Sequence, residues 1–464
     1  MSRVDLRTLE GRIHFMGIGG AGMCALAELM LRDGGQVSGC DLKMGESARH
    51  LQALGAEVMI GHDASHVAGL AALVRTAAVP EDHPELVAAR ALGIPVLKRA
   101  EALGAVVNTG RVIAIAGTHG KTSTTAMTVR VLEEGGQDPT GFVGGSVAAW
   151  GGNLRRGSDL YVVEADEYDR SFHTLEPDVA VVTNLEADHL DIYGDLAGVR
   201  EAFEIFLGAL RPGGRAVICA DDTGASALLT SVGGAGYTYG TSAGSQLRAV
   251  EVSAHGTGTR FRVIEEGKDQ GEARIPLPGL HNLRNGLAAA AVARHLGVSW
   301  AAIHAGWASF EGVGRRFEVL GERAGVMVVD DYAHHPTEVA ATLSAARDAF
   351  PGRRLVVAFQ PHLYSRTRDF ADEFGTTLSA ADEVWLTDIF PAREAPIDGV
   401  DSELIGRVVE SAGTPLRRHG DVATLADAMA TAVGAGDLVL TMGAGSIEQT
   451  GPALVARLEA PIHA

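Results

Sequence analysis

Short apolar runs rich in branched side chains alternate with stretches of helical periodicity along most of the chain. The pattern predicts a strand at 13–17, a helix at 21–33, whose apolar residues are spaced three and four apart, and a strand at 36–39. Further strands are predicted at 112–116, 159–163, 179–183, 215–219, 326–330, 354–359, 383–387 and 437–441. Further helices are predicted at 122–134, 283–296 and 337–349. Alternation of strands and helices is typical of doubly wound α/β folds with parallel sheets.

The alternation pauses at two places, which suggests domain boundaries. It pauses around 98–110, before a fresh strand, and around 311–316, where a long helical stretch ends. A chain of 464 residues is also too long for one ordinary core. We therefore predict three domains, at 1–107, 108–313 and 314–464. The stretch 240–276 alternates apolar and polar residues, and we expect it to form an antiparallel edge or a flap of the middle domain.

The composition is that of an ordinary globular protein and disfavours several functional classes. The formal net charge of −19 is unfavourable for a general nucleic-acid binder. No apolar run approaches the ~18 residues of a membrane span, and the N-terminal residues lack the apolar segment of a signal peptide. The three cysteines, Cys24, Cys40 and Cys219, have the spacing of neither a disulfide framework nor a metal motif. We expect a cytoplasmic protein without nucleic-acid or membrane partners.

The stretch AGTHGKTSTT has the features of a phosphate-binding loop. It follows the strand that is predicted to end at Ala116, and its two glycines allow a tight turn whose N–H groups point inward. Lys121 can reach the outer phosphates of a nucleotide, the hydroxyl of Thr122 can bind Mg²⁺, and the N-terminus of the following helix favours anions. Ile115 stands where the strict motif has its first glycine, so this is a variant of the motif. The alternative is a glycine turn with a helix-capping threonine.

Two acidic stretches follow later strands. The first, EADEYDRSF, contains the carboxylates of Glu164, Asp166, Glu167 and Asp169. The second, TNLEADHLDIYG, contains the polar residues Asn184, Glu186, Asp188, His189 and Asp191. Ligands of open α/β sheets lie at the carboxyl ends of strands, where the phosphate loop also lies, so the three segments are expected to converge. Carboxylates beside a triphosphate require a cation between them, and Mg²⁺ prefers oxygen ligands of this kind. Solvated acidic loops are the alternative.

A second glycine-rich turn, GIGGAG at 17–22, fits the pattern of a dinucleotide-binding turn between a strand and a helix. Asp41 stands about twenty residues further on, where a ribose-binding acid is found in such folds. The same geometry suits any diphosphate, so the motif alone leaves a nicotinamide-dependent oxidoreductase and a nucleotide-sugar enzyme equally open. The phosphate loop favours ligation, with ATP at one site and a UDP-linked substrate at the other. A non-catalytic nucleotide-binding module is disfavoured because Glu167 and His189 are present.

Motifs spread over nearly the whole chain resemble those of the Mur ligases of bacterial cell-wall synthesis. They are, in order, HFMGIGGAGM, AGTHGKTSTT, EADEYDRSF, TNLEADHLDIYG, LHNLRNGLAAAAVA, GVGRRFE, DDYAHHPTEV, FQPHLYSRTRDF and DIFPAREAPIDG. The resemblance implies a ligase that uses ATP and Mg²⁺ to join L-alanine to the lactyl carboxylate of UDP-N-acetylmuramate through an acyl phosphate, in peptidoglycan precursor synthesis. The alternative is a ligase that attaches recycled murein tripeptide to the same sugar. Either enzyme would act on small molecules, as a monomer or a homodimer.

The resemblance also assigns roles to the three predicted domains and to individual residues. It implies a Rossmann-like N-terminal domain for the UDP substrate, a central domain like those of P-loop ATPases, and a Rossmann-like C-terminal domain for the amino acid. The residues implied to bind the UDP substrate are Gly19, Gly20, Ala21, Gly22, Met23 and Asp41. Those implied to bind ATP are Gly117, Thr118, His119, Gly120, Lys121, Thr122, Ser123, His281, Asn282, Asn285, Arg316 and Asp331. Those implied to bind L-alanine are Tyr332, His334, His362 and Arg366. The implied metal positions are Thr122, Glu167 and His189, and the implied catalytic residues are Lys121, Glu167, His189, Arg316 and His334.

Two departures from the family pattern change these expectations. Several siblings carry a carbamylated lysine between two metal ions, but this chain has no lysine from 122 to 267, so another group or water takes its place. Leu363 stands where alanine-adding relatives often have arginine, which shifts the binding of the alanine carboxylate to Arg366. A histidine of near-neutral pKa, His334 or His362, is the candidate for accepting the proton of the attacking amine.

Overall fold

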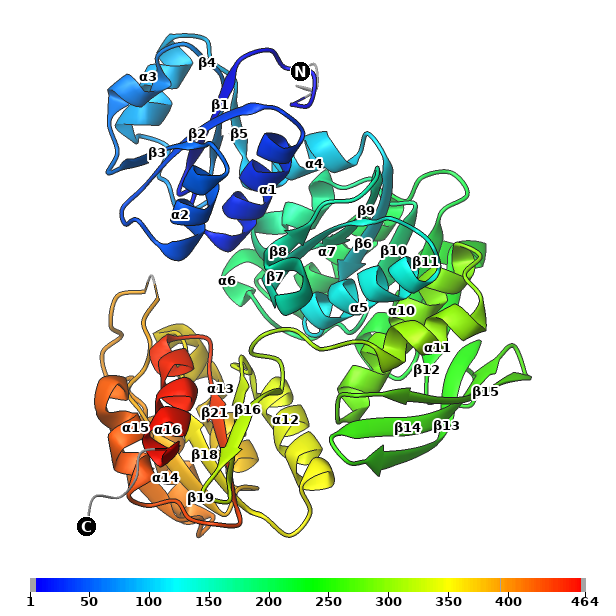
Figure 1. Ribbon diagram of the computed structural model, residues 1–464, viewed down its shortest axis with the longest axis vertical. Coiled ribbons are helices and arrows are strands. Elements are labelled where there is room, and N and C mark those ends of the chain that lie inside the picture. The colour runs from blue at the N-terminus through cyan, green and yellow to red at the C-terminus, as the bar shows by residue number, and fades with distance from the viewer. Residues whose placement is uncertain (1–5, 393, 460–464) are drawn as a thin grey trace. The chain divides into compact units, whose positions relative to one another are not determined.

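The structure, a computed structural model, describes residues 6–392 and 394–459. Within these residues the chain forms three sheets built mainly of parallel strands and accompanied by helices (Figure 1). Each strand and helix predicted from the periodicity is present, with ends that differ by a few residues at most, and the predicted α/β fold class is confirmed. Every helix in the described part of the chain is too short or too polar to cross a bilayer.

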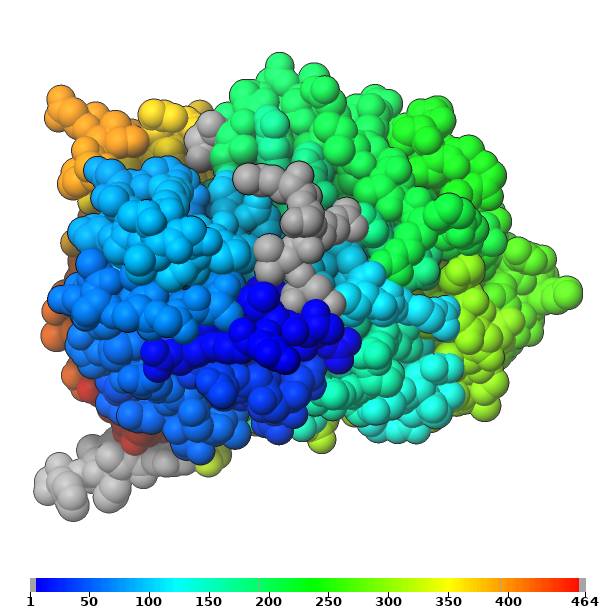
Figure 2. Space-filling model, turned by 90° about the horizontal axis from the view of Figure 1, so that it is seen from above, coloured from blue at the N-terminus to red at the C-terminus, as the bar shows by residue number. Residues whose placement is uncertain are grey.

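The first sheet has five parallel strands in the order β3-β2-β1-β4-β5. Its strands are β1 (Arg12–Met16), β2 (Gln36–Asp41), β3 (Glu57–Ile60), β4 (Leu70–Arg75) and β5 (Val96–Lys98). Its helices are α1 (Ala21–Arg32), α2 (Glu46–Ala53), the short η1 (Ala64–Val67), α3 (Pro84–Ala91) and α4 (Arg99–Val107). These residues form a continuous surface in the space-filling view, where they are drawn in shades of blue (Figure 2).

Successive side chains of β1 point to opposite faces of the first sheet, and each face is covered by its own apolar core. Ile13 and Phe15 belong to the core that includes the apolar face of α1. Met16 belongs to a separate core with residues of η1 and α3, and His14, two positions earlier, points to the same face of the sheet. The strand is buried on both faces and carries a histidine among its apolar residues.

The second sheet has ten strands in the order β15-β14-β13-β12-β11-β10-β6-β9-β7-β8. They are β6 (Arg111–Ala116), β7 (Thr140–Val147), β8 (Gly152–Arg155), β9 (Leu160–Glu164), β10 (Val179–Val182), β11 (Arg215–Cys219), β12 (Gly236–Gly240), β13 (Leu247–His255), β14 (Gly258–Glu265) and β15 (Lys268–Ile275). Strand β6 pairs in parallel with β9 on one side and β10 on the other. The stretch 240–276 supplies β13, β14 and β15 at one end of the strand order, as expected of an edge.

Helices of varied length accompany this second sheet. They are η2 (Ala148–Trp150), η3 (Tyr168–Thr174), η4 (Gly233–Ala235), α5 (Lys121–Glu134), α6 (Leu190–Tyr193), α7 (Leu196–Gly208), α8 (Thr223–Ala227), α9 (Leu229–Val232), α10 (Leu280–His295) and α11 (Trp300–Ala308). Helix α5 begins directly after the loop that follows β6, so its N-terminus lies at the carboxyl end of the sheet.

The third sheet has six strands in the order β16-β17-β21-β18-β19-β20. They are β16 (Glu318–Arg323), β17 (Val326–Asp331), β18 (Arg354–Phe359), β19 (Glu383–Leu386), β20 (Leu416–Arg418) and β21 (Asp437–Met442), and all pairs are parallel except β16 with β17. Its helices are α12 (Pro336–Ala349), α13 (Tyr364–Leu378), α14 (Glu403–Ser411), α15 (Val422–Ala430), η5 (Ser446–Gln449) and α16 (Thr450–Glu459). Two apolar cores cover its opposite faces.

Candidate active site

The loop between β6 and α5 has the backbone of a phosphate-binding turn. Gly117 and Gly120 both have positive φ angles, of 141° and 82°, in which an L side chain is strained. A methyl group added at Gly117 would lie 1.9 Å from Oγ1 of Thr183, and one added at Gly120 would lie 2.6 Å from Oδ1 of Asn285. Both positions therefore require glycine for conformation and for space. Asn285 of α10, which the sequence assigned to the nucleotide site, lies beside this loop.

Lys121, the first residue of α5, is held by an unusually polar set of partners. Its Nζ donates to the carbonyl oxygens of Gly117 at 2.7 Å and Thr118 at 3.2 Å, and to both carboxylate oxygens of Glu167 at 2.9 and 2.8 Å. Burial opposes the charge of the amine, but the carboxylates of Glu167, Asp166 and Glu164 outweigh it and raise the pKa of Lys121. Lys121 is thus a cation at neutral pH, positioned at a helix N-terminus.

Glu167 is the buried anionic partner of this lysine. It is 3% exposed, and burial raises the pKa of its carboxyl group to about 7, although Lys121 acts in the opposite direction. Nε2 of His189 lies 3.8 Å from Oε1 of Glu167, so two of the predicted metal positions are neighbours. His189 has a φ of 52° and directly precedes α6. The convergence expected from the sequence is present here.

A further carboxylate, that of Glu164, completes the group. The hydroxyl of Thr122 donates to Oε1 of Glu164 at 3.0 Å, and the N–H of Gly144 donates to Oε2 at 2.6 Å. The sequence named Glu164 as an acid at the end of a strand but did not assign it to the metal. Its position at the end of β9, the strand next to β6, is the feature of the sequence from which its place near the metal site could have been predicted. A hydroxyl, two carboxylates and an imidazole in one place form a donor set that fits Mg²⁺ with nucleotide phosphates.

The segment after β10 shapes the loop from its other side. The backbone N–H of His119 donates to Oδ1 of Asn184 at 2.7 Å, and Nδ2 of Asn184 donates back to the carbonyl of His119 at 3.0 Å. The hydroxyl of Thr183 donates to the same carbonyl at 2.6 Å. The N–H of Glu186 donates to Oγ1 of Thr118 at 2.9 Å. These contacts fix the backbone of the turn and the side chain of Thr118. The sequence placed Asn184 in the polar stretch expected near the loop but did not foresee its bonds to the backbone of His119, and it assigned no role to Thr183.

Helix α10 carries the remaining central-domain candidates. Asn282 is 3% exposed, and its Nδ2 donates to the carbonyl of Pro278 at 2.8 Å. Its amide therefore holds the start of the helix. Asn285 lies one turn further along, beside Gly120. Ser123 of α5 is likewise buried.

The N-terminal glycine turn is built around Asp41. The N–H of Gly17 donates to the carbonyl of Cys40 at 2.8 Å, and the N–H of Gly19 donates to Oδ2 of Asp41 at 2.9 Å. A methyl group added at Gly22 would lie 3.0 Å from Nη1 of Arg99. Arg99 was missed in the sequence because it lies far along the chain, at the start of α4, yet it brings a guanidinium to the turn. Gly20 and Ala21 are exposed, whereas the side chain of Met23 is buried.

The C-terminal sheet places a buried acid at the end of β17. Asp331 is 6% exposed and accepts hydrogen bonds from the N–H groups of Phe317 at 2.7 Å and Ala333 at 2.8 Å. Burial raises the pKa of Asp331 to about 6, with Arg316 acting in the opposite direction. The guanidinium of Arg316 lies over the ring of Tyr332, 4.9 Å from its centre. Three of the predicted residues are therefore adjacent.

The two candidate histidines are also neighbours. The ring centres of His334 and His362 are 5.7 Å apart. Nδ1 of His334 lies 3.0 Å from the carbonyl oxygen of Tyr332 and 3.2 Å from Oε2 of Glu338. Nδ1 therefore carries the proton, and Nε2 is the atom that can accept one. Glu338 was not identified from the sequence.

His362 has a different environment from His334. Burial, with the nearby charges of His334 and Arg366, lowers the pKa of His362 to about 3, so its ring is neutral. The ring stacks on Phe390 at a centre distance of 5.8 Å. Leu363 follows with a φ of 70°, and its N–H donates to the carbonyl of Phe390 at 2.9 Å. Arg366, one turn into α13, is 7% exposed.

Comparison with known proteins identifies relatives of each part of the chain. Residues 12–111 match the model described as the Mur ligase family, catalytic domain. Residues 115–293 match the Mur ligase middle domain, and residues 315–445 match the Mur ligase, glutamate ligase domain.

Relatives that are similar over the full length are known as well. The UDP-N-acetylmuramate–L-alanine ligase of Geobacter sulfurreducens is 46% identical over 458 residues, which cover 97% of this chain and 98% of the relative. The crystal structure of the UDP-N-acetylmuramate–alanine ligase of Thermotoga maritima superposes with a TM-score of 0.83 at 30% identity, covering 97% of this chain and 99% of that one. A murein peptide ligase from Psychrobacter arcticus has a TM-score of 0.71 at 24% identity, covering 98% and 100%, and shares the fold.

Proposed function

The chain belongs to the Mur ligase family, and we propose that it is an ATP-dependent enzyme that joins L-alanine to the lactyl carboxylate of UDP-N-acetylmuramate in peptidoglycan synthesis. One observation carries the proposal. The loop that presents Lys121 meets the carboxylates of Glu164 and Glu167, in a chain 46% identical to a ligase of that name. We expect the reaction to take place in the cytoplasm, on small molecules, with the chain acting as a monomer or a homodimer.

The chemistry explains why a phosphate loop is needed. A carboxylate does not condense with an amine in water, because oxide is a very poor leaving group. Transfer of the γ-phosphoryl group of ATP to the carboxylate gives an acyl phosphate, from which phosphate leaves when the amine attacks. Positive charge close to the transferring group stabilises its transition state, and Lys121 supplies that charge. When ATP binds, we expect the ammonium group to exchange Glu167 for the phosphates.

Mg²⁺ is the metal that the donor set fits. We propose that Thr122, Glu167 and His189 hold it, with Glu164 as an additional oxygen donor next to Thr122. The bound ion would offset the charge of the phosphates. The acids would otherwise repel ATP, and the carbamylated lysine of some siblings is absent from this stretch of the chain.

The roles of the other domains follow the family pattern. We propose domain boundaries near residues 107 and 313, with the UDP substrate at the N-terminal glycine turn and Asp41. We propose that Arg316 and Asp331 contact ATP, together with His281 and Asn282 of α10.

The amino acid is assigned to the C-terminal domain. Arg366 would bind the alanine carboxylate, with Tyr332 and His362 lining its site. His334 would accept the amine proton at Nε2, because Glu338 and the carbonyl of Tyr332 hold Nδ1. Glu338 is then a positioning residue for that histidine.

A coupled phosphate-release assay tests the assignment. With UDP-N-acetylmuramate and ATP present, L-alanine is expected to give kcat/KM at least about a hundredfold above that of the murein tripeptide L-alanyl-γ-D-glutamyl-meso-diaminopimelate. The opposite preference would establish the tripeptide ligase, which remains the second candidate. Release that requires neither acceptor would contradict both.

A further inference from the structure

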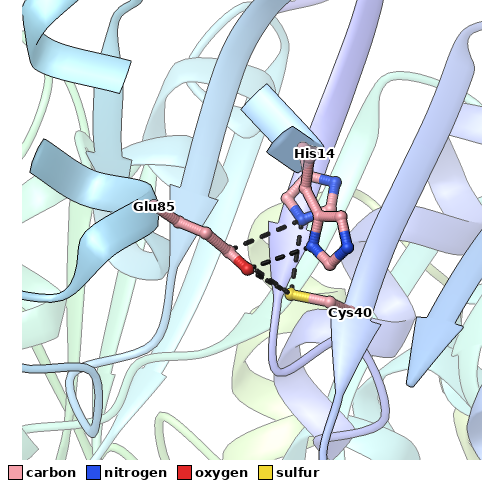
Figure 3. A group of neighbouring side chains, drawn as sticks. His14, Cys40 and Glu85 are labelled. Carbon is pink, nitrogen blue, oxygen red and sulfur yellow. Dashed lines mark hydrogen bonds and ion pairs between the residues drawn. The ribbon is translucent and has the colours of Figure 1, made fainter. Parts of the chain in front are cut away.

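A cluster of metal-ligating side chains lies inside the N-terminal domain, outside every site described above. It consists of His14 on β1, Cys40 on β2, His66 on η1 and Glu85 on α3. One ligating atom of each residue lies within 4.8 Å of those of the other three. Figure 3 shows the side chains of His14, Cys40 and Glu85 pointing toward one another. The four ligands come from four separate elements.

Four separations between these ligand groups are close to those around a tetrahedral ion. Nε2 of His14 lies 3.3 Å from Sγ of Cys40, which lies 3.5 Å from Oε2 of Glu85. Nδ1 of His66 lies 3.1 Å from Oε1 of Glu85, and Nε2 of His14 lies 3.9 Å from Oε2. Zinc–ligand bonds of about 2.0–2.3 Å place the ligand atoms of a tetrahedron roughly 3.3–3.8 Å apart.

The charge of the cluster calls for a cation. Glu85 is fully buried, and its carboxylate is approached by the rings of His62 and His66, the thiol of Cys40 and the N–H of Asp63. Among the described residues, no lysine or arginine lies within ion-pair distance of Glu85. A buried carboxylate is costly unless it is paired with a cation. A divalent ion supplies that charge.

The strands hold two of the ligands in a binding orientation. Nδ1 of His14 lies 2.9 Å from Oγ of Ser38, its direct partner on β2, so Nε2 faces the cluster. Cys40 lies two residues beyond Ser38 on the same strand and therefore on the same face of the sheet. A hydrogen bond from the second ring nitrogen is the usual support of a metal-ligating histidine.

We propose that His14, Cys40, His66 and Glu85 bind one structural Zn²⁺ ion. Two imidazoles, a thiolate and a carboxylate are a ligand set that zinc accepts, and four protein ligands close the tetrahedron, as in structural rather than catalytic sites. His14, Cys40 and Glu85 are fully buried, whereas His66 and His62 are partly exposed, so the ion enters past these two rings. Nδ1 of His62 lies 3.1 Å from the sulfur of Cys40, at the edge of the site.

The ion would stabilise the glycine turn as well as the domain. It joins the paired strands β1 and β2 to η1 and α3, on the face of the sheet that is otherwise packed by a small apolar core. The carbonyl of Cys40 accepts the N–H groups of Gly17 and Ile18, and Asp41 follows directly. Zinc would therefore fix the strand ends that carry the turn, without contacting a substrate.

The test uses untagged, full-length protein, because a polyhistidine tag binds zinc itself. The protein is stripped with a chelator, dialysed against Zn²⁺, Co²⁺ or Mg²⁺, freed of excess ion, and its metal content is measured by mass spectrometry. We expect one Zn²⁺ or Co²⁺ per chain in this domain and no retained Mg²⁺. The Co²⁺ form should show the strong visible bands of tetrahedral cobalt and a thiolate charge-transfer band.

Substitutions locate the ion. Cys40→Ser and Glu85→Gln should each lose the retained zinc, and Cys40→Ser should lose the charge-transfer band. Cys219→Ser is the matched control, since it replaces another buried free cysteine and should retain both signals. Zinc should also raise the thermal midpoint of the stripped protein by roughly 5 °C, but not that of Cys40→Ser.

The proposal is overturned if the stripped protein retains no zinc, or if Cys40→Ser and Glu85→Gln retain it as the unsubstituted protein does. The cluster would then be a hydrogen-bonded group around Glu85 with a protonated histidine as its cation. Should the variants fail to fold, the cobalt spectrum of the unsubstituted protein decides alone, because absence of the thiolate band excludes Cys40 as a ligand.

Discussion

The two glycine-rich turns follow central strands of their sheets in the same way, yet their surroundings differ. At the turn after β6, a methyl group at Gly117 would lie 1.9 Å from the hydroxyl of Thr183. At the turn after β1, a methyl group at Gly19 would lie 3.0 Å from the carboxylate of Asp41. The helix after the central turn, α5, begins with Lys121 and Thr122, whereas the helix after the N-terminal turn, α1, begins with Ala21 and Gly22.

Under the proposed function, this difference separates the turn that takes part in the chemistry from the turn that binds the UDP substrate. Phosphoryl transfer requires charge held close to the reacting group, and the central turn has a partly buried ammonium group between backbone carbonyls and Glu167. The N-terminal turn offers backbone N–H groups and a nearby guanidinium, that of Arg99, which suffices for a diphosphate that does not react. The same type of glycine turn can therefore support phosphoryl transfer or binding alone, depending on the side chains around it.

The largest expected effect is that of Lys121→Ala. Removing the ammonium group deletes the charge that stabilises the transferring phosphoryl group and leaves Glu167 buried without its partner. We expect kcat/KM for phosphate release to fall by about 10³-fold or more. Lys268→Ala, at an exposed lysine of β15, is the control and should stay within about twofold of the unsubstituted enzyme. Turnover retained by Lys121→Ala would refute the assignment of this lysine.

Substitution of Gly120 by alanine measures how tightly the central turn is packed. Gly136, at the other end of α5, is the matched control, because its φ of 75° is also positive but no atom lies within 4 Å of an added methyl group. In both variants an alanine must adopt a positive φ, which costs about 1–2 kcal/mol. Only Gly120→Ala also brings the added methyl group too close to Asn285. We expect kcat/KM to fall about a hundredfold for Gly120→Ala and to change little for Gly136→Ala.

Equal activity of the two alanine variants would show that the contact with Asn285 is unimportant. Their thermal midpoints separate a local effect from general destabilisation. If the midpoints fall by similar amounts while only Gly120→Ala loses activity, the loss lies in the site.

The central site could be predicted from the sequence because its signals are local. The end of a strand, two glycines, a lysine and a threonine follow one another within 116–122. Because β6 and β9 are parallel neighbours, Glu164 and Glu167 lie at the same edge of the sheet as this loop. The sequence did not reveal that Glu164 contacts Thr122, since that depends on the register between β6 and β9. It also did not show that Asn184 clamps the backbone of the loop.

Contacts between distant segments escaped prediction for a physical reason. Arg99 reaches the glycine turn, and Glu338 orients His334, through the packing of helices, which leaves no pattern in a short stretch of sequence. The cysteines showed no metal spacing because Cys40 has histidine and glutamate neighbours rather than a second cysteine. Such clusters are visible only once the strands are paired.

The smallest effect is expected at the N-terminal turn, from Asp41→Ala. The carboxylate accepts the N–H of Gly19, so its removal loosens the turn but leaves the phosphate loop intact. We expect the KM for UDP-N-acetylmuramate to rise about tenfold, with kcat and the KM for ATP within about twofold, because only substrate binding is weakened. Asp41→Asn keeps an acceptor oxygen for Gly19 and should recover most of the loss if the turn, rather than the charge, is what matters. A fall in kcat as large as the rise in KM would mean that this turn also acts in the transition state, and the distinction between the two turns would fail.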